Sequence, residues 1–176
     1  EQGTFYILQT RNGKRTSAAA VKIACDMVKE GLIDEKTALL RVPASSLTQL
    51  LLPSFDPKAR IDHELLTIGL PASPGAASGK LAFSAEEAVQ RTLAGEKVLL
   101  VRAETSPEDV DGMHHAVGIL TSTGGMTSHA AVVARGWGKC CVAGAGDVEI
   151  DERHKKIHVA GRTYGKNDIL SLDGSA

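Results

Sequence analysis

The pattern of hydrophobic and polar positions divides the chain into a helical first part and a second part that alternates between strands and helices. The first part opens with a run rich in β-branched and aromatic residues, Thr4–Thr10, which predicts a strand that ends at the turn Asn12-Gly13. Hydrophobic residues then recur at helical spacing, which predicts a helix from a Thr16 or Ser17 cap to Glu30.

Two shorter helices are expected next. Asp34 is the expected cap of a helix that runs to Arg41, and Ser45 or Ser46 caps another that ends before Pro53. Helices this short are not stable alone, so they must pack on each other or on a neighbouring domain. This part of the chain therefore indicates a structured linker rather than a core.

The second part, from residue 65 onward, shows alternating strand and helix patterns. Small residues predict a loop at 73–79, and strands are expected at 80–83, 97–102, 117–121 and 140–143. Helices are expected between these strands, beginning at the capping signals near Ser84 and Ser106 and, after a Gly-Gly turn, covering about 127–135. A tail of short strands follows. The order predicts an α/β domain in which helices cover a sheet.

Composition and charge narrow the class of protein. The chain has 176 residues, 43% hydrophobic and 23% charged, with a formal net charge of −1, which suits one well-packed domain with an appendage. No basic excess indicates nucleic acid binding, and no apolar stretch is long enough for a membrane span. The first residues show neither a secretory leader nor an initiator Met, so we expect an intracellular protein and a fragment or processed chain.

The three cysteines, Cys25, Cys140 and Cys141, are expected to be reduced. An odd count with two adjacent residues makes a poor disulfide framework, and no CxxC pair is present for zinc. Because side chains alternate along a strand, one of Cys140 and Cys141 is expected to face the core. His114 and His115 lack the carboxylate or cysteine spacing of a metal site, so no metal ligand is expected in this segment.

His129 is the strongest candidate for chemistry. Gly124 and Gly125 follow a predicted strand, permit a sharp turn and let a substrate approach the main chain closely. Thr127 or Ser128 can cap the next helix, and we expect Thr127 in that role. His129 then lies in the first helical turn, where free N–H groups and the helix dipole disfavour an imidazolium and stabilise an attached phosphoryl group. On spacing alone, a packed or surface histidine is the more frequent outcome.

The segment around His129 resembles the phosphohistidine signature of the phosphoenolpyruvate-utilising enzymes. It runs from Gly124 to Arg135 as Gly-Gly-Met-Thr-Ser-His-Ala-Ala-Val-Val-Ala-Arg. The segments 9–16, 104–109, 136–142 and 171–174 are similar to the pyruvate, phosphate dikinase branch of that family. Met126 and the adjacent cysteines differ from what the phosphoenolpyruvate synthase and sugar phosphotransferase branches usually have. The resemblance covers essentially the whole chain; a phosphocarrier module of a phosphoenolpyruvate synthase is the alternative.

The resemblance implies a swivelling β/β/α phosphohistidine domain that serves two other active sites. His129 would take a phosphoryl group on Nε2 from ATP at an ATP-grasp domain and pass it to pyruvate at a C-terminal barrel. ATP, phosphate and pyruvate would give AMP, diphosphate and phosphoenolpyruvate, reversibly. The implied parts are the end of the ATP-grasp domain at 1–15, a helical linker at 16–64 and the phosphohistidine domain at 65–176, with hinges near 14–17 and 57–67.

The resemblance also implies roles for residues around the histidine. Gln9 and Arg11 match positions that face the nucleotide. Arg135 is a candidate either for capping carbonyl groups or for reaching a neighbouring domain. Thr127 matches a threonine that a regulatory protein phosphorylates in plant members of the family.

Several parts of the implied enzyme lie outside these residues. Ligands for Mg²⁺ and the contacts of a homodimer are expected elsewhere in a full-length chain, so this chain alone is not expected to phosphorylate itself or to turn over pyruvate. A stand-alone carrier and a scaffold with a decayed site are competing hypotheses. The leftover strand at 1–13 argues against the first, and the intact motif around His129 argues against the second.

Overall fold

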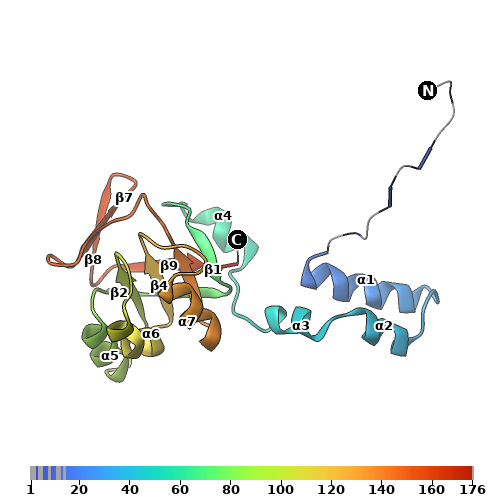
Figure 1. Ribbon diagram of the computed structural model, residues 1–176, viewed down its shortest axis with the longest axis horizontal. Helices are drawn as coiled ribbons and strands as arrows, with labels where there is room; N and C mark the ends of the chain where they lie inside the picture. The colour runs from blue at the N-terminus through green and yellow to red at the C-terminus, as the bar shows by residue number, and fades with distance from the viewer. Residues whose placement is uncertain (1–2, 4–5, 8, 11–12, 14, 176) are drawn as a thin grey trace. The chain divides into compact units, whose positions relative to one another are not determined.

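The computed structural model describes residues 3, 6–7, 9–10, 13 and 15–175, and it divides the chain into two compact units (Figure 1). The first unit is Glu1–Leu51 and the second is Leu52–Ala176. Within the described part of the chain, no helix has the length and apolar character needed to cross a membrane.

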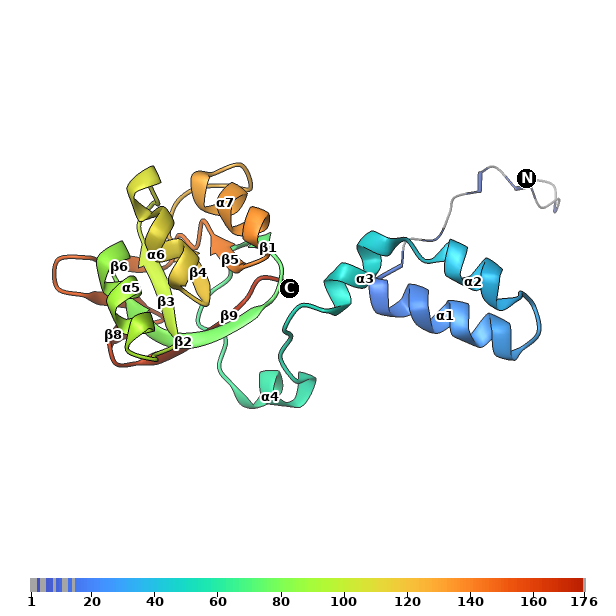
Figure 2. The same ribbon diagram turned by 90° about the horizontal axis from the view of Figure 1, so that it is seen from below.

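The residues described in the first unit form three short helices: α1 (Ser17–Lys29), α2 (Glu35–Arg41) and α3 (Ala44–Leu50) (Figure 2). The predicted caps of α1 and α2 are confirmed, because Thr16 and Asp34 each accept a hydrogen bond from a backbone N–H of the first turn. The predicted serine cap of α3 is wrong. Pro43 stands at that cap in extended conformation and makes no capping hydrogen bond. Proline is tolerated there because its φ is fixed and its missing N–H is not needed before the first helical turn.

The strand expected at Thr4–Thr10 is not formed where the structure describes this run. Tyr6, Ile7, Gln9 and Thr10 are outside any strand, and the remaining residues of the run lie outside the described residues. A strand requires a neighbouring strand to bond its N–H and C=O groups, and the described elements of this unit are helices.

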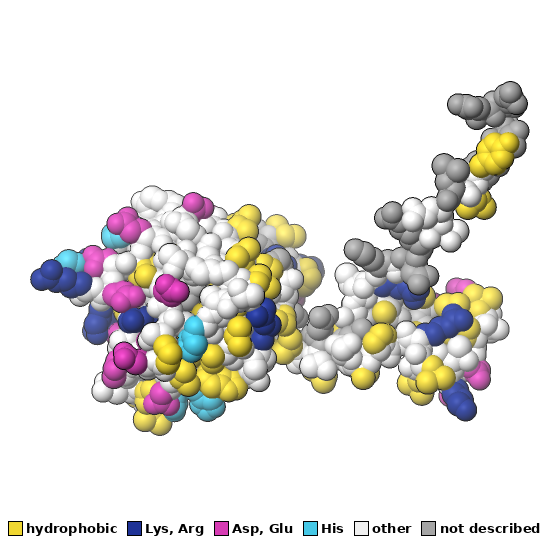
Figure 3. Space-filling model, in the orientation of Figure 1, with side chains coloured by type: hydrophobic (Ala, Val, Ile, Leu, Met, Phe, Trp, Pro, Cys, Tyr) yellow, Lys and Arg dark blue, Asp and Glu magenta, His cyan; other side chains and the backbone are white. Residues whose placement is uncertain are grey.

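Hydrophobic side chains remain exposed on the helices of the first unit (Figure 3). Leu39 and Leu40 of α2 are 78% and 80% exposed, and Ala24 is the buried hydrophobic residue of this unit among those described. Helix α1 also packs against α2 and α3, which is one of the two arrangements expected for helices this short.

A six-stranded sheet forms the centre of the second unit. Its strands, in the order β1-β5-β4-β3-β2-β9, are β1 (Leu70–Ser73), β5 (Cys140–Ala143), β4 (Gly118–Thr121), β3 (Val98–Arg102), β2 (Ala76–Ala82) and β9 (Ile169–Asp173). The four central strands are parallel, and β1 and β9 pair antiparallel at the edges. The loop expected at 73–79 is wrong for residues 76–79, because these small residues pair with β9.

Helices and a second sheet cover the two faces of the large sheet. The helices are α5 (Ala85–Leu93), α6 (Val110–His115) with the preceding 3₁₀ turn η1 (Pro107–Asp109), and α7 (His129–Trp137). On the other face lies an antiparallel sheet of β6 (Glu149–Asp151), β7 (Lys156–Val159) and β8 (Arg162–Gly165). Figure 1 shows α5, α6 and α7 toward the bottom of the second unit and β7 and β8 at its left and upper left. The predicted β/β/α class is confirmed.

Both faces of the large sheet are packed with hydrophobic side chains. One cluster lies under the helices and includes Met113, Ile119 and Cys141, and the other lies under the small sheet and includes Phe83 and Cys140. The expected alternation of the two adjacent cysteines is confirmed, since they belong to the clusters on opposite faces of the sheet. Both are buried, because the sheet has a core on each side. Burial raises the pKa of Cys140 to about 11 and that of Cys141 to about 12.

The second unit also contains a helix that the sequence did not predict, α4 (Pro57–Asp62). Asp56 caps it, and Pro57 occupies its first position. Arg60 of this helix pairs with Asp173 at 3.3 Å, and Glu64 just after it pairs with Arg162 at 2.7 Å. The compact unit therefore begins at Leu52, earlier than the boundary expected at residue 65.

Candidate functional site

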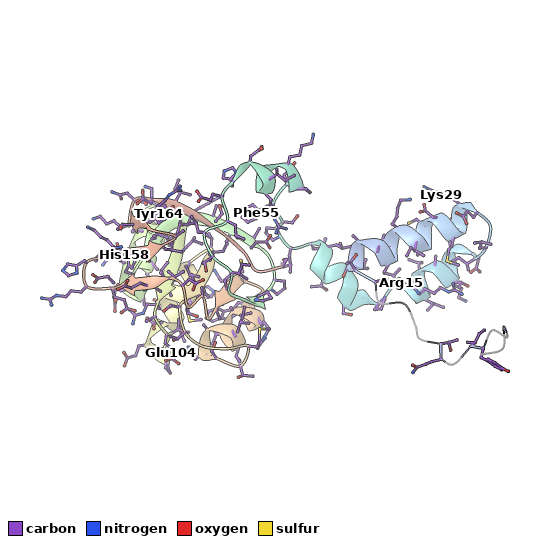
Figure 4. All side chains as sticks on the ribbon, turned by 90° about the horizontal axis from the view of Figure 1, so that it is seen from above. Arg15, Lys29, Phe55, Glu104, His158 and Tyr164 are labelled. Carbon is purple, nitrogen blue, oxygen red and sulfur yellow. The ribbon has the colours of Figure 1, made fainter. Side chains whose placement is uncertain are left out.

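Two loops meet at the carboxyl ends of the parallel strands β3 and β4. The first loop, residues 103–106, leaves β3, and the second, residues 122–128, leads from β4 into α7. In open α/β sheets this edge is where ligands bind. Figure 4 shows Glu104 of the first loop at the edge of the larger unit.

Ser128 caps the helix that carries the histidine. It has extended backbone angles, and its Oγ accepts a hydrogen bond from the Ala131 N–H at 3.3 Å. The expectation that Thr127 is the cap is wrong, because the cap is the residue directly before the first helical residue, His129. Thr127 is exposed in the turn before it, and Gly124 at φ +93° supplies the left-handed conformation that starts this turn.

The His129 ring is half-buried and held at one nitrogen. Its Nδ1 lies 3.3 Å from Oγ1 of Thr105, whose side chain is buried. An Nδ1–H that donates to this hydroxyl leaves a lone pair on Nε2. Thr105 was not singled out from the sequence, and the one signal for it was the similarity of residues 104–109 to the family. The site can therefore present Nε2 as a nucleophile at the positive end of a helix.

Hydrogen bonds fix the loop before the histidine to its surroundings. The Thr123 N–H and hydroxyl both donate to the carbonyl of Ala103, at 3.0 and 2.8 Å. The Thr123 carbonyl accepts from the Thr121 hydroxyl at 2.8 Å and from the Gly144 N–H at 3.3 Å. The loop is thus tied to the end of β3 and to the loop that follows β5.

Arg135 holds the same loop from the other side. Its Nη2 donates to the carbonyl of Met126, and its Nη1 donates to the carbonyl of Ala72 on β1. Of the two roles considered for Arg135, the structure shows the bonding of carbonyl groups. These carbonyls belong to the loop and to an edge strand rather than to the end of α7.

The other predicted residues lie away from this site or outside the described chain. Gln9 belongs to the first unit, and Arg11 lies outside the described residues. His114 and His115 pack edge to face, with ring centroids 5.6 Å apart, and His114 also packs against Trp137. Across the described residues, no group of three His, Cys, Asp or Glu side chains is placed to hold a metal ion.

Comparison with known proteins finds one matching family and several similar proteins. Residues 94–176 match the family described as PEP-utilising enzyme, mobile domain. The chain is 57% identical over 175 residues to a pyruvate, phosphate dikinase of Clostridium symbiosum, covering 99% of this chain and 20% of that protein. It is 55% identical over 176 residues to that of Rhizobium meliloti (strain 1021), covering 100% and 19%, respectively.

A plant relative has a similar identity and coverage. The chloroplastic pyruvate, phosphate dikinase of Flaveria pringlei is 53% identical over 175 residues, covering 99% of this chain and 18% of that protein. The chain therefore spans about a fifth of the length of the curated relatives it matches.

Proposed function

Residues 94–176 belong to the family of the PEP-utilising enzyme mobile domain, and on that premise we propose that this chain is the phosphoryl-carrier segment of a pyruvate, phosphate dikinase. His129 takes a phosphoryl group derived from ATP and delivers it to pyruvate. The full-length enzyme converts ATP, phosphate and pyruvate to AMP, diphosphate and phosphoenolpyruvate, reversibly. The contact between Nδ1 of His129 and Oγ1 of Thr105 carries the proposal, because it engages Nδ1, and a ring that donates from Nδ1–H to this hydroxyl keeps the Nε2 lone pair free for attack.

The transfer proceeds at a single ring nitrogen. The Nε2 lone pair attacks the β-phosphorus of ATP, the bond from this phosphorus to the oxygen of the leaving AMP breaks, and its electron pair leaves with that oxygen. Phosphate then takes the outer phosphoryl group and leaves as diphosphate, so that one phosphoryl group stays on Nε2. Nδ1 keeps its proton and its hydrogen bond to Thr105 throughout. The positive end of α7 stabilises the negative phosphoryl oxygens. In the second half of the cycle, the enolate oxygen of pyruvate attacks the same phosphorus and frees Nε2.

The rest of the chain serves the movement of this histidine. Residues 1–15 are the end of an ATP-grasp domain, where Gln9 and Arg11 face the nucleotide. The helices of residues 16–51 are a linker to the phosphohistidine domain, whose compact unit begins at Leu52. The ion pairs of Arg60 and Glu64 bind α4 to that domain, so the helix moves together with it. Mg²⁺ ligands, the pyruvate site and the homodimer contacts belong to parts of the enzyme beyond these residues.

Thr127 is a site of regulation in this proposal. It is exposed and lies two residues before His129, so a kinase can reach its hydroxyl. A phosphate on Thr127 would place two negative charges beside the acceptor ring and repel the incoming phosphoryl group. Removal of that phosphate by a phosphatase would restore transfer.

The test uses the full-length enzyme that contains this chain. Treatment with ATP and Mg²⁺, followed by mass spectrometry under alkaline conditions, is expected to find an acid-labile phosphate on His129. A His129→Asn variant is expected to lose it, while a His158→Asn variant, changed on the small sheet, is expected to keep it. Labelling that persists in His129→Asn, or that is absent from the unchanged enzyme, would overturn the proposal.

A further inference from the structure

We propose that an ion network centred on Arg102 positions the His129 ring, so that Asp109 and Glu152 are positioning residues for phosphoryl transfer although neither touches the ring. The inference rests on the proposed function of His129. Arg102 ends β3, Asp109 lies in η1, and Glu152 lies in the turn between β6 and β7. Nothing in the sequence pattern linked these three residues.

Asp109 fixes the turn that presents Thr105. Its carboxylate is buried, and Oδ2 accepts hydrogen bonds from the Ser106 N–H at 2.9 Å and the Ser106 hydroxyl at 3.3 Å. Because Thr105 directly precedes Ser106, this closed turn determines where the Thr105 hydroxyl lies.

Arg102 joins Asp109 to the rest of the sheet. Its Nε lies 3.5 Å from Oδ1 of Asp109, and its Nη1 lies 3.3 Å from Oε2 of Glu152. The same Nη1 donates to the carbonyl of Phe83 at 3.1 Å. Partial burial of the Arg102 side chain, which is 24% exposed, strengthens these interactions relative to a pair in water.

Glu152 bonds the first loop of the site at Ala103, the residue to which the second loop is bonded. Its Oε1 accepts a hydrogen bond from the Ala103 N–H at 3.1 Å, and the carbonyl of Ala103 accepts the two hydrogen bonds of Thr123. Through these contacts, one network holds both the loop of Thr105 and the loop that leads to His129. The turn between β6 and β7 is thereby bonded to the site at the carboxyl ends of β3 and β4.

The chemical consequence is a preferred tautomer. A ring that donates from Nδ1–H to the Thr105 hydroxyl keeps its proton on Nδ1 and offers Nε2, whereas a hydroxyl that donates to Nδ1 would leave the proton on Nε2. The tautomer measurement distinguishes the two. A loosened turn lets the ring exchange its proton between the two nitrogens. The fraction of rings with a free Nε2, and with it the rate of phosphoryl acceptance, then falls.

The test determines which nitrogen of the His129 ring is protonated in this chain. Two-bond ¹H–¹⁵N correlation of the ¹⁵N-labelled protein assigns the protonated nitrogen of His129. We expect Nδ1–H in the unchanged protein and in Thr105→Ser, and a mixture of tautomers in Thr105→Val, Asp109→Asn and Glu152→Gln. Glu152→Gln keeps an acceptor for Ala103 and removes only the charge that faces Arg102. Asp151→Asn, which alters an exposed pair with His154 in the same turn, is the matched control and is expected to match the unchanged protein.

A small-molecule phosphoryl donor, phosphoramidate, supplies the kinetic readout without the missing domains. We expect the rate of His129 phosphorylation, followed by ³¹P NMR, to fall roughly 10- to 100-fold in Asp109→Asn and Glu152→Gln, as for other small misplacements of reacting groups. Unchanged tautomer and rate in folded Glu152→Gln would overturn the inference, even if Asp109→Asn fails to fold. If unchanged His129 accepts no phosphoryl group, the proposed function fails, whereas the tautomer result still decides on the network.

Discussion

The carbonyl oxygen of Gly124 lies so close to Gly144 that a Cβ built on Gly144 would come within 2.6 Å of it. Gly144 also has a φ of +61°, a conformation that other residues rarely adopt. The loop after β5 thus packs, backbone against backbone, on the loop that leads to His129. Gly144 also donates its N–H to Thr123, so the contact is fixed by a hydrogen bond.

Replacing Gly144 with Ala is expected to disturb the site. The methyl group must displace the Gly124 loop, and the positive φ is strained for alanine. We expect the free energy of unfolding to fall by about 1–3 kcal/mol, measured by urea denaturation. Gly146→Ala is the control, because a Cβ there meets no atom within 4 Å. Equal stability of the two variants would contradict the packing described here.

Ser128 and Thr127 are expected to differ in their effect on stability. Ser128→Ala removes the cap of α7 and is expected to lower the free energy of unfolding by about 1 kcal/mol. Thr127→Ala changes an exposed residue of the preceding turn and is expected to change it by less than about 0.5 kcal/mol. Thermal denaturation of the two variants side by side distinguishes the residues, and a reversed order would show that Thr127 provides the cap.

Thr127→Asp is expected to abolish phosphoryl acceptance by His129 in the full-length enzyme. A carboxylate beside the ring repels the incoming phosphoryl group, as a phosphate would. Thr127→Asn, which has the same size without the charge, is expected to retain most of the activity. Phosphohistidine formation from ATP is the measurement, and a fully active Thr127→Asp enzyme would count against regulation at this position.

Stability is expected to fall at alkaline pH because of the two buried thiols. Burial raises the folded-state pKa of Cys140 to about 11 and of Cys141 to about 12, from an ordinary value of 9.0. The contribution of the two neutral thiols to the free energy of unfolding is complete below about pH 9. It is lost as the pH rises through this range, because the thiols of the unfolded chain ionise at a lower pH than those of the folded protein.

Urea denaturation at about pH 8 and about pH 10 tests this dependence. A Cys140→Ala, Cys141→Ala double variant is expected to show a smaller decrease in stability between the two pH values. Cys25→Ala, which changes an exposed cysteine, should keep the decrease of the unchanged protein. If the double variant shows the same decrease in stability as the unchanged protein, other groups cause that decrease.

Incubation of this chain alone with radiolabelled ATP is expected to leave it unlabelled. The proposed site that binds ATP and Mg²⁺ belongs largely to a domain beyond these residues. The full-length enzyme under the same conditions serves as the positive control. Efficient labelling of the isolated chain would contradict the proposal that the ATP site belongs largely to another domain.

Local signals in the sequence predicted the elements that depend on neighbouring residues. The Asp34 cap and the Ser84 cap lie three residues from the N–H groups that they accept, so short-range pattern was sufficient to locate α2 and α5. The motif around His129 likewise predicted a turn and a helix in the right place. The choice between Thr127 and Ser128 failed because both are good caps and adjacent.

Contacts between distant segments could not be predicted in this way. Thr105 and His129 are 24 residues apart, and Glu152 is 49 residues from Ala103, so only the sheet topology brings them together. The burial of both Cys140 and Cys141 depends on a second sheet that covers the far face. Alternation along one strand carries no information about what packs on either side.

The ion pairs that hold α4 to the second unit also set the reach of the carrier. With Arg60 and Glu64 bound to that unit, which begins at Leu52, the segment that joins α3 (Ala44–Leu50) to it is short. A tether this short confines a histidine to a small volume and gives it a high effective concentration at any partner domain it can reach. Lengthening this segment would dilute His129 at its partners without altering a single contact inside the domain.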